Sequence, residues 1–193
     1  MKKLLLVITM VTTAFTLRAQ EFYQSVGLSY MILTYNQEYK IVGFDEVYSN
    51  SGYLGAPTIT YNPMLAFDLN GGPQLVAAAY PSLGFSFSSS GGDNYLALQL
   101  PLAAELFFGD LEDLGGFVGL GLNFGLAGTD YASGTTGGPE LSAGGQFYAF
   151  DNLIKLRGAY TIGAIKSQDD DGIEFVTDKR SLINLSILYY LGM

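Results

Sequence analysis

The chain has 193 residues, of which 49% are hydrophobic, only 14% are charged and 25 are glycine. Acidic residues outnumber basic ones by 18 to 9, which gives a net charge of −9 and excludes a nucleic-acid-binding surface. His and Cys are both absent. This excludes Ser–His and Cys-based nucleophilic sites, ordinary zinc sites, disulfides and lipid attachment through cysteine. We therefore expect a protein that is not an enzyme and has no cofactor.

The N-terminus has the pattern of a cleaved signal peptide, residues 1–19. Lys2 and Lys3 precede an apolar stretch from Leu4 to Phe15, and Ala19 supplies the small residue before a cut. A spanning helix needs about 20 apolar residues, so this stretch is too short to be an anchor. We expect export and one mature domain, residues 20–193.

Eight stretches of the mature chain alternate apolar residues with small or polar ones, which is the period of a strand with one apolar face. In chain order they are 22–35, 58–69, 75–87, 95–108, 116–128, 141–150, 153–166 and 181–193. The fifth is the clearest, because Val118, Leu120 and Leu122 alternate with Gly119 and Gly121. No charged residue occupies an expected outward position.

The connections between these stretches alternate in length. The longer ones are 36–57, 88–94, 128–140 and 166–180, and the shorter ones are 70–74, 109–116 and 151–152. Since only helices and closed barrels can pair all backbone groups in lipid, the pattern predicts an all-β protein. Its fold would be a single eight-stranded antiparallel up-and-down transmembrane β-barrel with both chain ends in the periplasm.

This pattern resembles the small outer-membrane β-barrel family of Gram-negative bacteria. The resemblance is most specific in the closing strand, where Leu185, Ile187, Tyr189 and Leu191 alternate and Met193 replaces the usual Phe. It implies an outer-membrane location, contact with outer-membrane lipid, and a C-terminal signal that the barrel assembly machinery reads. The alternative is a soluble secreted barrel or sandwich with the large residues turned inward.

Four charged residues have the parity of lumen-facing positions: Asp68, Glu105, Lys155 and Arg157. All four lie near the expected periplasmic ends of their strands. Buried charges must be paired, so we interpret them as a structural plug of ion pairs rather than a catalytic or proton-relay site. The lumen-facing glycines above them either let the strands close tightly or leave a vestibule for a small apolar ligand.

Three prolines, Pro63, Pro81 and Pro101, fall inside the expected strands. A closed barrel has no edge strand to accommodate a missing donor, so we expect bulges or local breaks of the ladder there.

The first long connection carries four aromatic residues, Tyr39, Phe44, Tyr48 and Tyr53, and is the candidate surface-recognition loop. Asp169, Asp171 and Asp178 have a weak calcium-like spacing that fits a solvated acidic loop better than a metal site. We expect a structural or surface-interaction role through acidic outer loops, with an unidentified external partner. The alternatives are a narrow channel or vestibule for small apolar molecules, and a soluble periplasmic ligand-binding barrel.

Overall fold

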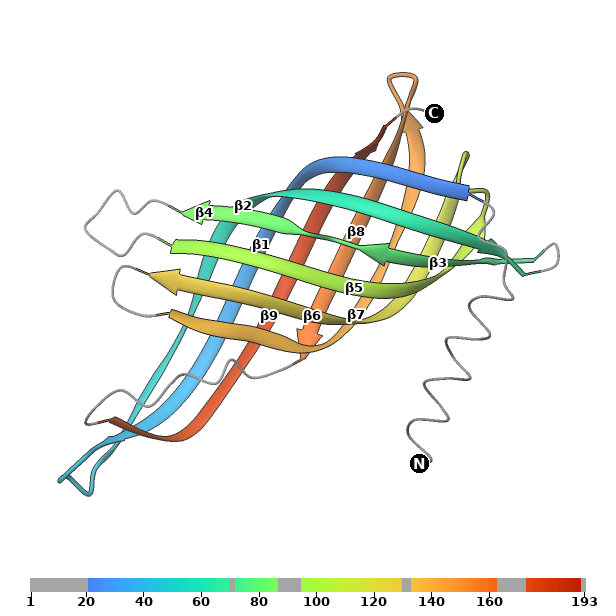
Figure 1. Ribbon diagram of the computed structural model, residues 1–193. Coiled ribbons are helices and arrows are strands. Elements are labelled where there is room, and N and C mark those ends of the chain that lie inside the picture. The colour runs from blue at the N-terminus through green and yellow to red at the C-terminus, as the bar shows by residue number, and fades with distance from the viewer. Residues whose placement is uncertain (1–20, 70–71, 87–94, 130–132, 163–172, 192–193) are drawn as a thin grey trace.

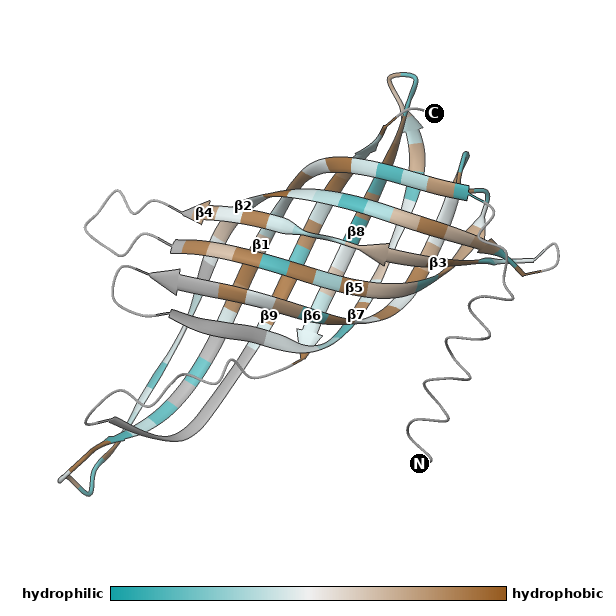
Figure 2. Ribbon diagram, viewed as in Figure 1, coloured by the Kyte–Doolittle hydropathy of each residue, from teal (hydrophilic) through white to brown (hydrophobic). Residues whose placement is uncertain are grey.

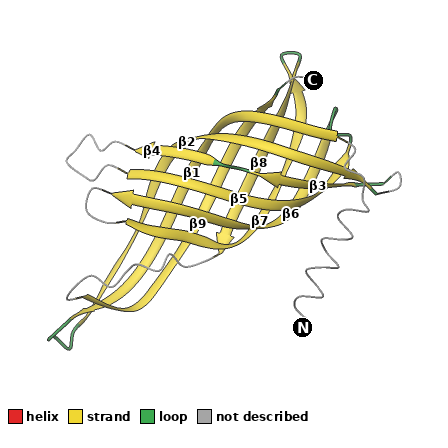
Figure 3. Cartoon of the chain, in the orientation of Figure 1, coloured by secondary structure: helices red, strands yellow, loops and turns green. Residues whose placement is uncertain are grey.

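The computed structural model describes residues 21–69, 72–86, 95–129, 133–162 and 173–191, which form one antiparallel sheet (Figures 1 and 3). Its strands are β1 (Glu21–Ile41), β2 (Val47–Asp68), β3 (Gln74–Ala79), β4 (Ser82–Ser86), β5 (Tyr95–Gly109), β6 (Gly115–Thr129), β7 (Ser133–Ala149), β8 (Asn152–Ile162) and β9 (Ile173–Tyr190). The sheet closes because β1 pairs with both β2 and β9. β3 and β4 occupy one place in the wall, since each pairs with β2 and β5. The predicted eight-stranded antiparallel barrel is confirmed.

The alternation of side chains sets the two faces of the wall (Figure 2). Leu120 is 66% exposed and Ile187 is 60% exposed on the outer face, whereas the inward positions are small, polar or paired. A soluble barrel would bury these large residues, so the soluble alternative does not match the structure. Among the described residues, no helix is long and apolar enough to cross a membrane.

Three of the expected connections are partly strand: 128–140 contains the start of β7 at Ser133, and the other two extend the pairing with β1. β1 and β2 pair without interruption from Glu21↔Ala66 to Lys40↔Val47, so the expected 36–57 loop is a β-hairpin with a short tip. β9 begins at Ile173 and pairs with β1 there, which replaces much of the expected 166–180 loop. Polar side chains and glycines favoured loops in both places, but backbone pairing with β1 outweighs that local preference. Residues 1–19, Asp169, Asp171 and Met193 lie outside the described residues.

The prolines produce one local break and no bulge at their own positions. Pro63 and Pro101 stay within β2 and β5, and their pairing to β1 and β6 keeps its register. Pro81 separates β3 from β4, yet the pairing of both segments with β5 continues in one register. A register shift occurs instead between Glu38 and Tyr39 of β1, opposite β9.

The lumen holds two clusters of buried apolar side chains. The half of the lumen next to the β5–β6 turn holds a cluster of buried residues that includes Tyr23, Phe107 and Phe117, and the opposite half holds a smaller one around Met31 and Leu182. An eight-stranded barrel has an interior just wide enough for such packing.

Candidate functional site

The charged residues of the lumen form one buried cluster. Lys155 Nζ lies 2.8 Å from Glu105 Oε2, and both side chains are fully buried. Arg157 Nη2 lies 2.5 Å from Glu140 Oε1, and its Nε lies 3.5 Å from Glu105 Oε1. Two acids therefore balance two bases, which is the condition under which charges can be buried.

Aromatic residues complete this cluster. Tyr80 donates a hydrogen bond to Glu105 and accepts one from Lys155 Nζ at 2.8 Å. The Arg157 guanidinium carbon lies 3.8 Å from the centroid of the Tyr80 ring, and Lys155 Nζ lies 4.5 Å from that of Phe117. These contacts hold both cations in fixed positions.

The structure brings together three of the four charged residues expected in the lumen and leaves out Asp68. Asp68 is the exposed last residue of β2, where its Oδ1 accepts a 2.9 Å hydrogen bond from Gln74. Asp68 does follow the inward alternation of its strand, as predicted. Because it lies at the rim of the barrel, however, the prediction that it belongs to the ion-pair plug is wrong. Glu140 takes the place expected of Asp68.

Sequence reasoning missed Glu140 because the glycines and proline before it favoured a loop. β7 instead begins at Ser133, and Glu140 continues the inward alternation of Ser142, Gly144 and Gln146. Extending the expected strand 141–150 by one inward position toward the N-terminus would have identified Glu140.

The turn between β5 and β6 folds under one end of the barrel. Leu111 of this turn is fully buried in the cluster of the lower lumen. Gln146 Nε2 donates to the carbonyls of Asp110 and Asp113 at 2.9 and 2.7 Å, and its Oε1 accepts from Tyr190 at 2.6 Å. The turn is therefore fastened beneath the barrel.

Above the charges the lumen carries a layer of hydroxyl and amide groups. Ser29 contacts both Thr60 at 2.7 Å and Ser186 at 2.8 Å through hydroxyl oxygens. Asn123 donates to Gln99 at 3.0 Å and to Thr161 at 3.2 Å. These hydrogen bonds join neighbouring strands, except that from Asn123 to Thr161, which reaches from β6 past β7 to β8. The apolar cluster around Met31 lies beyond them.

The glycines of the lumen lie against neighbouring strands. A Cβ atom added at Gly121 would lie 2.3 Å from the Leu102 carbonyl oxygen, and one at Gly144 would lie 2.0 Å from that of Leu156. One at Gly119 would lie 2.6 Å from Ser142 Oγ. At these three positions the glycines allow close packing of the strands rather than lining a vestibule.

Beyond the closed barrel, three strands continue as a sheet that we call the strand extension: residues 35–41 of β1, 47–55 of β2 and 173–180 of β9 (Figure 1). Within the described residues, β8 pairs with β9 as far as Ile162↔Ser181, and β1 pairs with both β2 and β9 in the extension, where it is the central strand. Tyr39 and Tyr48 stack across it with ring centroids 5.8 Å apart. Tyr53 is 76% exposed, Phe44 is 64% exposed, and Asp45 and Glu46 lie beside Phe44 at the exposed tip.

The closing strand fastens the barrel and presents an apolar row outward. Leu185, Ile187, Tyr189 and Leu191 are all exposed on the outer face. Leu191 donates its backbone N–H to the Gln24 carbonyl at 2.8 Å, which continues the pairing with β1. Of the calcium-like set, Asp178 lies in β9 opposite Gln37, and no group of three potential metal ligands occurs among the described residues.

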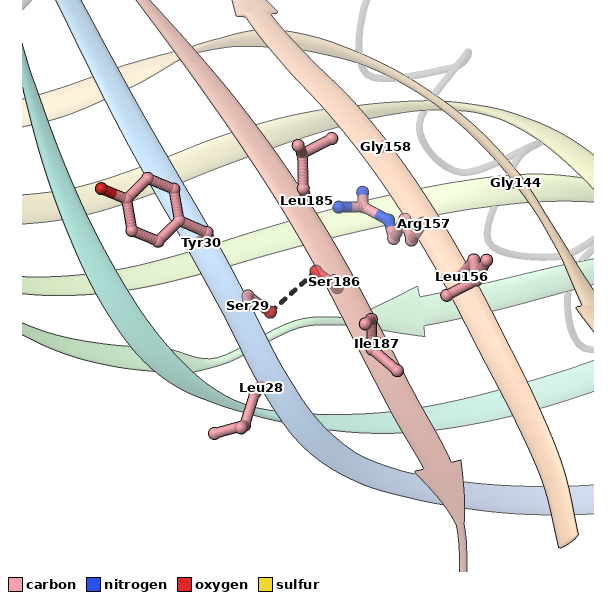
Figure 4. A pocket seen from close by; sticks show the side chains of 10 residues that line it. All are labelled: Leu28, Ser29, Tyr30, Gly144, Leu156, Arg157, Gly158, Leu185, Ser186 and Ile187. Carbon is pink, nitrogen blue, oxygen red and sulfur yellow. Dashed lines mark hydrogen bonds between the residues drawn. The ribbon is translucent and has the colours of Figure 1, made fainter. Parts of the chain in front are cut away.

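The outer wall carries two hollows of about 490 Å³ each, both lined mainly by apolar groups. One lies over β1, β9 and β8, where Gly158 leaves a gap between Leu156, Leu185 and Tyr30 (Figure 4). The other lies over β2, β3 and β5 around Ala77, Ala79 and Ala104.

The sequence matches no protein-family model, and no curated protein matches it. The fold, however, is similar to solved outer-membrane barrels. Neisserial surface protein A has a TM-score of 0.52 and 11% identity, over 88% of this chain and 99% of that one. The outer membrane protein AlkL, solved in lipid bilayers, has a TM-score of 0.52 and 11% identity, over 90% of this chain and 92% of that one. The chain thus has the fold of the small outer-membrane barrels.

Proposed function

We propose that the protein is a non-enzymatic barrel of the outer membrane that acts through contacts made by its strand extension outside the cell. The observation that carries this proposal is the contrast between a lumen whose charged groups are paired with one another and an extension whose aromatic groups are exposed. The fold shared with Neisserial surface protein A and AlkL supports the location.

The chemistry of the tip suggests the kind of partner. Val42 and Phe44 are exposed apolar residues, and Asp45 and Glu46 follow them directly. An aromatic anchor surrounded by charge is a common composition for a contact surface. We therefore expect a partner with an apolar patch bordered by basic groups.

The location can be tested by cysteine labelling, because the native chain has no cysteine. Tyr53→Cys lies in the extension, whereas Phe150→Cys replaces a residue that is 95% exposed in the turn at the opposite end of the barrel. In intact cells a membrane-impermeant maleimide should label only Tyr53→Cys, and Phe150→Cys should react after the outer membrane is permeabilised. Labelling of both variants in intact cells, or of neither, would contradict the proposed orientation.

The contact role can be tested on the same two ends. Cells that carry the protein should adhere to immobilised basic proteins more than to acidic ones, and Phe44→Ser should remove this difference. Phe150→Ser, an equally conservative change on the far side of the membrane, should leave adhesion unchanged. Equal adhesion of the wild type and Phe44→Ser would exclude the tip as the contact surface.

We further propose that the outward row of β9 is read by the barrel assembly machinery. Tyr189 and Tyr160 provide a matched pair, since they are 44% and 42% exposed and their hydroxyls donate at 2.8 and 3.0 Å to a neighbouring strand. Tyr189→Ser should lower the amount of protein inserted in cells much more than Tyr160→Ser. Equal insertion of the two variants would assign the effect to the lipid-facing surface in general.

A further inference from the structure

The three prolines inside the strands gather at one place in the wall. The flanking pairs Met64↔Ala78 and Thr60↔Ser82 place Pro63 opposite Ala79 and Tyr61 opposite Pro81. The pairs Ala79↔Leu102 and Ser82↔Gln99 place Tyr80 opposite Pro101. Backbone N–H donors are therefore missing from two adjacent seams of the barrel, by which we mean the boundary of β2 with β3–β4 and the boundary of β3–β4 with β5. The missing donors lie within a few residues of each other.

The remaining hydrogen bonds identify which carbonyls lose their donors. Tyr61 N donates to Pro81 O at 3.0 Å, and Tyr80 N donates to Pro101 O at 2.8 Å. In an antiparallel ladder such pairs exchange two bonds, and the return bond needs the N–H that proline lacks. The carbonyls of Tyr61 and Tyr80 therefore have no donor from the ladder.

At the third proline the protein supplies its own donor. Backbone groups two residues apart point to the same neighbouring strand, so the Ala79 carbonyl faces Pro63 and lacks its ladder donor too. The buried Asn62 side chain donates to this carbonyl through Nδ2 at 2.9 Å. For Tyr61 and Tyr80, the described residues provide no comparable side-chain donor.

The second outer hollow borders these seams. Ala77 pairs with Ala104 and Ala79 with Leu102, so three small outward residues lie together between the larger Phe22, Leu65 and Leu102. Ala79 directly precedes Tyr80 in the sequence, and Leu102 directly follows Pro101. The hollow is thus lined by alkyl groups, and the Tyr80 carbonyl belongs to the residue that directly follows Ala79 at its border.

We propose that this hollow binds a bilayer-dissolved molecule that has an alkyl chain and a hydroxyl group. The hollow is continuous with the apolar outer face of the barrel, so its occupant comes from the lipid phase. The alkyl chain lies over Ala77 and Ala104, and the hydroxyl donates to the Tyr80 carbonyl, which is costly to leave unpaired in hydrocarbon. This inference concerns the wall of the barrel and does not depend on the proposed contact role.

The hollow around Gly158 is a built-in control. It has the same volume, about 490 Å³, and an apolar lining. Its backbone ladder is continuous, because β8 pairs with β9 from Ile154 to Ile162 and β1 pairs with β9 through Ser29↔Ser186. It should accept an alkyl chain without preferring a hydroxyl group.

The direct test uses 1-dodecanol and dodecane as probes of the protein in phosphatidylcholine nanodiscs. Tyr80–Pro81 is the one Tyr-Pro step of the chain, so ¹³C-carbonyl tyrosine with ¹⁵N proline isolates the Tyr80 carbonyl signal. Dodecanol should shift this signal downfield in a saturable way, and dodecane should not. No saturable shift, or the same shift with dodecane, would overturn the proposal.

Two variants separate the two parts of the site. Pro101→Ala restores the N–H opposite Tyr80 and should abolish the dodecanol shift while raising the melting temperature. Pro139→Ala, in β7 and outside the hollow, should leave the response intact. Ala77→Leu fills the hollow and should weaken the response at least tenfold, whereas Ala143→Leu, beside Gly158, should not. An unchanged response in both Pro101→Ala and Ala77→Leu would also overturn the proposal.

Discussion

The charged cluster of the lumen, on β5, β7 and β8, and the strand extension, on β1, β2 and β9, are parts of one sheet that use their side chains in opposite ways. In the lumen, Glu105 and Lys155 are fully buried and each contacts a charge of opposite sign. In the extension, Tyr53 and Phe44 are mostly exposed. We therefore expect the charges to stabilise the closed barrel, and the exposed aromatic groups support the contact role that we propose for the extension.

The largest expected effect comes from removing one charge of the lumen. Lys155→Met leaves Glu105 and Glu140 with Arg157 alone, so one buried negative charge is uncompensated. Unpairing a buried charge costs about 3–5 kcal/mol. Urea unfolding in detergent or liposomes should show a loss of this size. A loss below about 1 kcal/mol, the range of surface pairs, would mean that the cluster does not hold the barrel closed.

A smaller effect is expected when the charge balance is kept. Glu105→Gln combined with Lys155→Met leaves only the balanced pair Arg157–Glu140. The double variant should be more stable than Lys155→Met alone, since no unpaired charge remains buried. If the double variant is no more stable than Lys155→Met alone, the two residues act independently.

The extension should show a weaker and local response. Tyr48→Ser removes the cross-strand stack with Tyr39, and such pairs contribute about 0.2–1 kcal/mol. Global unfolding should hardly change, whereas amide hydrogen exchange should become faster in residues 35–41 and 47–55. A global loss as large as that of Lys155→Met would remove the distinction between the two regions.

The smallest effect is expected at the rim. Asp68→Asn alters an exposed carboxylate whose neighbour is Gln74, so the free energy of unfolding should change by less than about 0.5 kcal/mol. A loss of several kcal/mol would return Asp68 to the ion-pair cluster.

The outer face was readable from the sequence because alternation along a strand directly fixes which side each residue faces. The charges at Glu105, Lys155 and Arg157 followed from the same parity. Glu140 and the strand extension did not, because pairing with a neighbouring strand extends strands through residues that locally favour loops. Leu111 was hidden for another reason, since a turn that folds under the barrel has no periodicity to reveal it.

The Tyr80–Pro81 step illustrates a further limit. The prolines predicted a disturbed ladder, but their gathering on neighbouring strands depends on strand register. Register is set by the pairing of distant segments, which one sequence does not display.

The most direct test of the sealed interior is electrical. The purified protein is reconstituted in planar lipid bilayers, with a porin in the same membranes as the positive control. If the ion cluster, the turn at Leu111 and the cap around Met31 close the lumen, the protein should produce no discrete, sustained conductance steps. Sustained steps from the wild-type protein, scaling with salt concentration as a water-filled pore requires, would contradict a closed barrel and favour a channel.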